Sequence, residues 1–168
     1  YRMKEKIQTR LSDGVAALKE KEADTVIIAG MGGLLTIRIL EAGEKVLKSV
    51  KTLVLQPQSE IGLVRKYLAE HGYQITAEDM VLDEGKYYPM MRAEHGTKEK
   101  WNAQEYEFGK YLIQDKNPVL MEFLKKEEKL CQEILSSIKG KQGEHIERRR
   151  TEVEERQRLI SLTKEQMI

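Results

Sequence analysis

A cluster of glycines stands where an apolar run gives way to a helical pattern, in the stretch AGMGG from Ala29 to Gly33. A loop without side chains lets a flat ligand approach the backbone, and α/β sheets bind ligands at the carboxyl ends of their strands. The dinucleotide pattern is not matched, because position 35 is leucine, and the lysine of a P-loop is missing. A tight turn that needs positive φ is the alternative. The candidate platform residues are Gly30, Met31, Gly32 and Gly33.

Polar residues also close the two strands predicted beside this one. Ser12-Asp13-Gly14 follows the strand before the glycine cluster, and Gln56-Pro57-Gln58 follows the strand after it. A carboxylate accepts hydrogen bonds from an amino or hydroxyl donor, and an amide both donates and accepts. Three polar strand ends in a row favour a ligand rim, although helix caps or Asx turns would use the same residues.

Aromatic and basic residues supply a third group, suited to nucleic acid. Lys86-Tyr87-Tyr88 follows a turn at the predicted sheet edge, and stacking of an unpaired base on a ring is worth about 1–3 kcal/mol. The alternative is that one tyrosine belongs to the core. Arg65, with Arg38 and Lys66, could contact phosphates, or these residues could lie on solvated helix faces.

A dense basic run, Arg148-Arg149-Arg150, has two readings. It could bind phosphates, but the glutamates around it allow helical ion pairs on a solvated face. The three histidines have no metal-ligand spacing, so we expect them at the surface and expect no metal site. They are His71, His95 and His145.

The elements that position these residues alternate between strand and helix patterns. The predicted strands are Lys6–Leu11, Thr25–Ala29, Thr52–Leu55, Tyr73–Leu82 and Lys86–Glu94, and the predicted helices are Val15–Lys21, Leu34–Val46 and Glu60–His71. This order indicates an α/β fold with a mostly parallel sheet and an antiparallel end. The run TVIIA is typical of a strand covered on both faces, and proline should end the next strand at Gln56-Pro57. Such a sheet alone would leave one edge open.

The composition changes after Gly96. A linker with Trp101 and Tyr106 leads to Asn117-Pro118, a helix entry with proline in the first turn. Helical spacing from Val119 to Ile138 and from Ile146 to Met167, with KGKQG between, predicts an antiparallel, coiled-coil-like helical hairpin. We therefore expect two domains, residues 1–97 and 98–168.

Length and charge narrow the class of protein. The chain has 168 residues, 34% of them charged, yet its net charge is +1, so contact with a polyanion must come from local patches. The single cysteine, Cys131, excludes a disulfide within the chain and fits a reducing compartment. No apolar run approaches the roughly 20 residues that span a bilayer. We expect a soluble, cytoplasmic protein with no membrane contact.

Several segments together resemble a known family. DTVIIAGMGG, the upstream SDG and the downstream LVLQPQ, GKYYPMMRAE and DKNPVLMEFL resemble the bacterial tRNA (adenine-22-N1)-methyltransferase family, class I S-adenosylmethionine enzymes. The resemblance runs from Tyr1 to about Ile138. It implies a Rossmann-like sheet, S-adenosyl-L-methionine as cofactor, tRNA as partner, and methylation of adenine N1.

The resemblance also implies roles for individual residues. Asp13 would contact the exocyclic amine of the cofactor adenine, with the Gly14 backbone nearby, and Ala29 to Gly33 would lie between methyl donor and target base. Gln58 stands where the family commonly has asparagine, and Pro89 where it often has an acidic residue. Adenine N1 is neutral with an available lone pair, so transfer requires in-line placement and no catalytic base.

One departure limits these expectations. The family's chain begins upstream with a strand, a cofactor loop and a second strand, so the resemblance implies that this is the C-terminal part of the enzyme and that it is inactive alone. A non-catalytic RNA-binding or self-association module is the first alternative. A class I methyltransferase with another substrate is the second. The sequence leaves the oligomeric state open.

Overall fold

A four-stranded mixed sheet forms the centre of the larger part of the molecule. The computed structural model describes residues 6–168, so the start of the predicted first domain, residues 1–5, lies outside it. The strands are β1 (Thr25–Met31), β2 (Thr52–Pro57), β3 (Tyr73–Asp83) and β4 (Lys86–His95), in the order β1-β2-β4-β3. Only β1 and β2 are parallel, since β4 is antiparallel to both neighbours. The α/β class is confirmed, but the described sheet is not mostly parallel.

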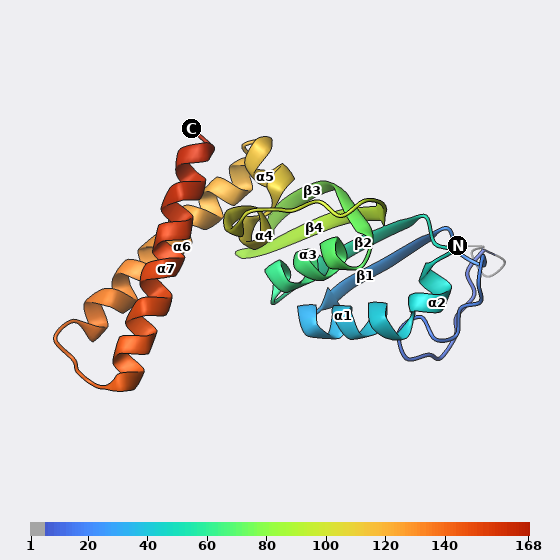
Figure 1. Cartoon of the computed structure of the whole chain (residues 1–168), viewed down its shortest axis with the longest axis horizontal. Helices are drawn as coiled ribbons and strands as arrows, with labels where there is room; N and C mark the ends of the chain where they lie inside the picture. Colours follow the sequence, from blue (N-terminus) through green and yellow to red (C-terminus); the bar gives the residue numbers. More distant parts are fainter. Residues whose placement is uncertain (1–5) are drawn as a thin grey trace.

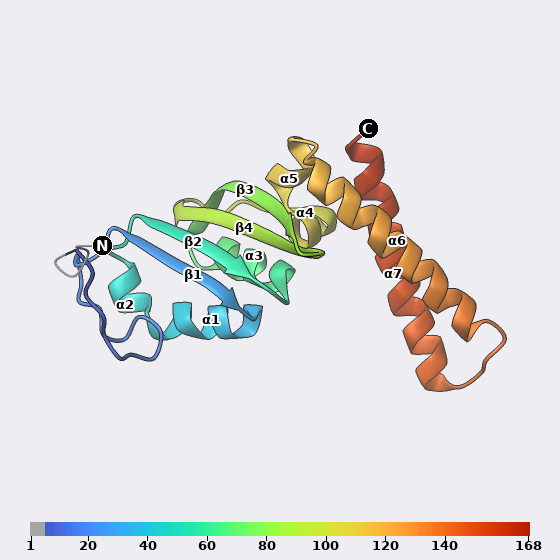
Figure 2. The ribbon, with the colours of Figure 1, turned by 180° about the vertical axis from the view of Figure 1, so that it is seen from behind.

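The helices α1 (Gly33–Ala42) and α3 (Ile61–Glu70) lie on one face of the sheet, and the other face is seen in Figure 2. Val26 and Ile28 of β1 are buried in the core on the helix side. Ile27, between them, is 70% exposed, so the expectation that both faces are covered is wrong in the described sheet. The described sheet has two edge strands, β1 and β3, and β1 has no strand on its outer side, as expected for an open edge.

The segment before β1 departs from the prediction. Residues 6–11 form no strand, and residues 15–21 form turns in place of a helix. Ile7 is 59% exposed and Leu11 is fully exposed, so the alternation of KIQTRL buries no apolar face. Val15 is buried in the core, and Leu18 is partly buried against it.

Two boundaries near the sheet also differ. The helix predicted over Leu34–Val46 is interrupted at Gly43, which separates α1 from α2 (Glu44–Leu47). Val15 packs against this glycine, since a Cβ there would lie 2.3 Å from Cγ2 of Val15. β2 continues through Pro57, which pairs with Met31 of β1. Proline is tolerated there because the ladder with β4 stops at Leu55.

The predicted linker contains two short helices, α4 (Ala103–Phe108) and α5 (Lys110–Gln114). A capping box starts α4, because the side chains of Asn102 and Glu105 each accept the other residue's backbone N–H. Trp101 is buried in the core, beside Tyr106. Neither helix is long enough to show an apolar periodicity in the sequence.

Two long helices, α6 (Pro118–Ile138) and α7 (Glu144–Gln166), lie side by side and project beyond the hairpin end of the sheet (Figure 1). The side chain of Asn117 caps α6 by accepting the N–H groups of Val119 and Leu120, and Pro118 starts the helix, as predicted. A second apolar core joins α6 and α7 to α4, α5 and β3; its members include Met80, Phe108, Leu120, Leu124, Val153 and Ile160. No helix in residues 6–168 is long and apolar enough to cross a membrane.

Candidate functional site

The glycine loop begins with a bulge at the end of β1. Ala29 pairs with Gln56 and Met31 with Pro57, so Gly30 is an extra residue with no partner in the ladder. Its φ is +75°, a conformation that favours glycine. Its backbone N–H donates to Oε1 of Gln56 at 2.9 Å, so the predicted rim residue Gln56 fixes the bulge.

The next glycines make room for the chain itself. A Cβ at Gly33 would lie 2.4 Å from the carbonyl oxygen of Ser59, which accepts the Gly33 N–H at 3.0 Å. A Cβ at Gly32 would lie 3.1 Å from Ser59 Oγ. The turn interpretation therefore explains Gly30 and Gly33, while residues Ala29 to Met31 remain exposed.

A cleft of about 520 Å³ opens between the sheet and the two long helices, and residues of the segment after β2, but none of the glycine loop, line it. Gln58 joins the two features, because its Nε2 lies 4.0 Å from the Cβ position of Gly30 and its side chain also lines the cleft. The apolar lining comes from α3, β3, β4, α4 and α6 and includes Met80, Tyr87, Pro89, Phe108, Leu120 and Phe123. Such an apolar cleft with a few polar groups is typical of a site for a small, flat ligand.

Glu60 lines the cleft from a strained position. Its φ is +44° and its ψ is +39°, the left-handed region, which is costly for a residue with a side chain. Ser59 donates its hydroxyl hydrogen to the Glu60 carboxylate. The segment that follows β2 thus holds a carboxylate at the junction of the loop and the cleft.

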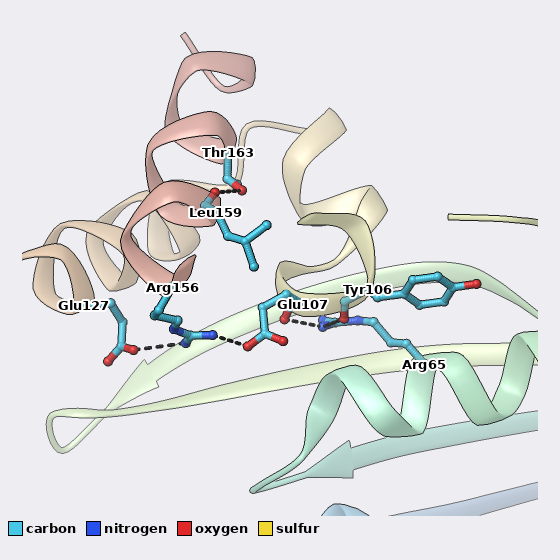
Figure 3. Close-up of polar contacts among 7 residues, drawn as sticks. All are labelled: Arg65, Tyr106, Glu107, Glu127, Arg156, Leu159 and Thr163. Atoms are coloured by element: carbon cyan, nitrogen blue, oxygen red, sulfur yellow. Dashed lines mark hydrogen bonds and ion pairs between the residues drawn. The ribbon is translucent and has the colours of Figure 1, made fainter. Parts of the chain in front are cut away.

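Arg156 of α7 forms the polar wall opposite (Figure 3). Its guanidinium donates to the carboxylate of Glu107 in α4 and, at 3.0 Å, to Oε2 of Glu127 in α6. The carbon of that guanidinium lies 5.0 Å from the ring centre of Phe108. Burial opposes its charge, but the two carboxylates outweigh burial and raise the pKa of Arg156.

Arg65 lines the same region but is not available to a phosphate. It is 1% exposed, its Nε donates to Glu78 Oε1 at 2.7 Å, and its Nη1 donates to the carbonyls of Tyr106 and Glu107 at 3.0 and 2.9 Å (Figure 3). The prediction of Arg65 as a substrate contact is therefore wrong, because all these donors hold α3, β3 and α4 together.

The basic and aromatic residues of the β3–β4 hairpin, Lys86, Tyr87 and Tyr88, do not all face the cleft. Tyr87 lines the cleft and packs edge-on against Phe123, with 5.2 Å between the two ring centres. Its hydroxyl group donates to Glu122 Oε1 at 3.1 Å. Tyr88 points to the opposite face because side chains alternate along a strand. Lys86 is exposed at the hairpin end, outside the cleft lining. Of the three predicted base contacts, only Tyr87 faces this site.

Asp13 and Gly14 do not join the other strand ends. Gly14 packs on Ile39, toward the C-terminal end of α1, where a Cβ would lie 2.8 Å from Ile39 Cγ2. The glycine loop is at the opposite end, because α1 begins at Gly33. The shared rim that we predicted is thus wrong for Ser12-Asp13-Gly14, whose segment forms no strand that could carry it to the edge.

Glu107 and Arg156 line the cleft but are not among the site residues predicted from the sequence. A signal for Arg156 exists, because it lies three residues after Val153 and four before Ile160, on the side of α7 that enters the core. A charge at such a position needs a buried partner. Glu107 carries no comparable signal. In the described range, 6–168, no three His, Cys, Asp or Glu side chains are grouped to hold a metal ion.

Comparison with known proteins gives consistent matches. The model of the tRNA (adenine(22)-N(1))-methyltransferase family matches residues 1–162. The tRNA (adenine(22)-N(1))-methyltransferase of Bacillus subtilis (strain 168) is 35% identical over 125 residues, 71% of this chain and 51% of that protein. The chain thus spans about half the length of this relative.

Solved structures show the same fold. A candidate tRNA (m1A22) methyltransferase of Streptococcus pneumoniae superposes with a TM-score of 0.87 at 35% identity, over 96% of this chain and 71% of that chain. The structure of that protein in complex with S-adenosyl-L-methionine superposes with a TM-score of 0.80 at 32% identity, over 93% of this chain and 67% of that chain. A Rossmann-superfamily protein of Streptococcus agalactiae superposes with a TM-score of 0.86 at 31% identity, over 96% of this chain and 69% of that chain. The sheet is therefore Rossmann-like.

Proposed function

The chain belongs to the tRNA (adenine(22)-N(1))-methyltransferase family, and we propose that its protein transfers a methyl group from S-adenosyl-L-methionine to N1 of an adenine in tRNA. The match of the family model to residues 1–162 carries this proposal. The geometry supports it, because the exposed glycine loop lies at the carboxyl end of the two parallel strands, where α/β sheets bind ligands, and Gln58 connects this loop to the apolar cleft.

The loop fits one side of a cofactor site. Residues Ala29 to Met31 are exposed, and the space beside Gly30 is open as far as the Gln58 amide. When bound, S-adenosyl-L-methionine would supply an electrophilic methyl group on its sulfonium. The predicted adenine contacts, Asp13 and Gly14, lie away from the loop and do not fit that site, so we give them no role in the mechanism.

The cleft suits an unstacked adenine. Its aromatic walls, Tyr87 and Phe123, offer apolar contact to a flat base that has left its stack. The Gln58 amide, between cleft and loop, can donate to or accept from the base edge. Because N1 already carries a lone pair, these residues need only orient the base and exclude water.

Carboxylates in the cleft can stabilise the positive charge that develops on the base. Methylation at N1 makes the adenine ring cationic, and two carboxylates, those of Glu60 and Glu107, line the cleft. Fixed negative groups near a developing positive charge stabilise the transition state without reorganisation. We assign this electrostatic role to Glu60 first, because Glu107 already binds Arg156.

The two parts of the chain would divide the work. In this proposal, residues 1–97 place the adenine and residues 98–168 hold the body of the tRNA in the cytoplasm. Arg149 and Arg150 pair with Glu152 and Glu147, so the basic run on α7 is partly neutralised. RNA contact by the long helices would therefore depend more on shape than on this run.

The test is nucleoside mapping. Unmodified tRNA is incubated with S-adenosyl-L-methionine and the protein produced from its complete gene, then digested and analysed by mass spectrometry. We expect 1-methyladenosine with the unaltered protein and with Leu34→Ala, an exposed neighbour outside the loop. Gly32→Val, which adds a side chain against Ser59, should abolish it. A different methylated nucleoside, or none, would overturn the proposal.

A further inference from the structure

The contact between the sheet and the long helices contains one ion pair that borders the cleft. Arg156 lies between Val153 and Ile160 on the buried side of α7, and its guanidinium reaches Glu107 at the end of α4 (Figure 3). Both side chains line the cleft. A change in the angle between α7 and the sheet would therefore change the shape of the cleft.

Glu107 is held from both sides. Its carboxylate accepts from Arg156 of α7, and its backbone carbonyl accepts from Nη1 of Arg65 in α3 at 2.9 Å. Arg65 is in turn anchored to Glu78 of β3. Named contacts thus run without a break from the sheet, through α3 and α4, to α7.

These contacts add to an interface that is mainly apolar and that also contains the hydrogen bond from Tyr87 of β4 to Glu122 of α6. The core around Phe108 and Ile160 joins the same elements, but apolar burial has no preferred direction, and helices can slide on it. An arginine bound to a carboxylate holds a defined geometry. Phe108 below the guanidinium restricts it further.

We propose that Arg156 and Glu107 act as positioning residues: their ion pair fixes the angle between the long helices and the sheet, so that a tRNA held by the helices presents its adenine to the glycine loop. This inference rests on the proposed function for its consequence in catalysis. Its geometric part, a fixed angle, stands independently of any activity.

The second carboxylate on Arg156 gives a matched control. Glu127 belongs to α6, so its bond to Arg156 ties together two helices that also share an apolar seam and a short connection. Glu107→Gln and Glu127→Gln each remove one negative charge from the same arginine. Of these two changes, only Glu107→Gln weakens the bond from α7 to α4, which Arg65 ties to the sheet, while the hydrogen bond from Tyr87 to Glu122 is left in place in both variants.

The first measurement is a distance distribution. Spin labels on cysteines introduced at exposed Glu70 of α3 and exposed Gln132 of α6 report the angle by pulsed electron spin resonance. We expect the distribution to broaden with Glu107→Gln and to stay narrow with Glu127→Gln. Equal distributions in the two variants would overturn the proposal.

The second measurement separates kcat from binding. With Glu107→Gln we expect kcat to fall about tenfold or more, as for a misplaced substrate, while the Kd for tRNA changes less than about twofold. If Arg156 instead bound a phosphate directly, Glu107→Gln would free it and tighten tRNA binding. Arg156→Met would then reduce the slope of log K for tRNA binding against log salt concentration by about one, as the loss of one phosphate contact does. Either result would overturn the positioning role.

Failure of the two proposals can be told apart. If the unaltered protein forms no 1-methyladenosine, the proposed function fails, and the spin-label distances still decide the positioning role. If it does form 1-methyladenosine and both glutamine variants retain the full kcat, the positioning role fails and the proposed function remains.

Discussion

Replacing Arg65 with methionine should destabilise the protein strongly, although sequence patterning places this residue on a surface helix. The side chains of Arg65 and Glu78 are 2% and 0% exposed, and their ion pair is 2.7 Å long. Arg65→Met would leave the Glu78 carboxylate buried without its cation, and the Tyr106 and Glu107 carbonyls without a donor. Breaking a buried pair by removing one partner costs about 3–5 kcal/mol.

Urea denaturation followed by circular dichroism measures this free energy of unfolding, with Arg38→Met on exposed α1 as the control. A loss of 3–5 kcal/mol corresponds to a fall in Tm of about 10 °C for a chain of this size. Arg38→Met should change stability by less than about 0.5 kcal/mol. If Arg65→Met lost less than about 1 kcal/mol and mainly weakened tRNA binding, Arg65 would be a phosphate contact after all.

Three further predictions concern single residues. Gly33→Ala should lower the free energy of unfolding, measured in urea, by about 1–3 kcal/mol, since its Cβ would overlap the Ser59 carbonyl. Unchanged stability would show that the loop after β2 can move away from the new side chain. Burial raises the pKa of Tyr67 to about 12, so the native protein should lose stability as the pH rises from 10 to 12. Tyr67→Phe should reduce that loss, to which Tyr73 and Tyr87 also contribute because their pKa values are raised, and should remove one late step in absorbance at 295 nm. Burial also raises the pKa of the Cys131 thiol, so dithionitrobenzoate should react with it much more slowly in native protein than in urea; equal rates would place the thiol at the surface.

Local patterns were sufficient for most of the sheet and for the helix entry at Asn117-Pro118. The β-branched runs at Thr25 and Thr52 and the turn before Lys86 each specify a strand by themselves. The early KIQTRL segment shows the limit, because alternation predicts a strand only if a neighbouring strand and an apolar face are present to receive it. Ile7 and Leu11 have neither in this structure.

The site was predictable in part, for a related reason. Gln56, Gln58 and Tyr87 follow or occupy strand ends, and the topology alone brings them to one region. The partners of Arg65 and Arg156 come from elements far apart in the chain, so no local spacing identifies them. A charge among buried positions, as at Arg156, is the one local hint that such a pair exists.

Photochemical cross-linking tests most directly whether the cleft receives the adenine. A tRNA that carries 8-azidoadenosine at the methylated position is bound to the protein produced from its complete gene and irradiated, and the adduct is located by peptide mass spectrometry. The account predicts adducts on Tyr87 or Phe123, which line the cleft. Adducts confined to the exposed face around Ile27, or to Arg148–Arg150 on α7, would contradict it.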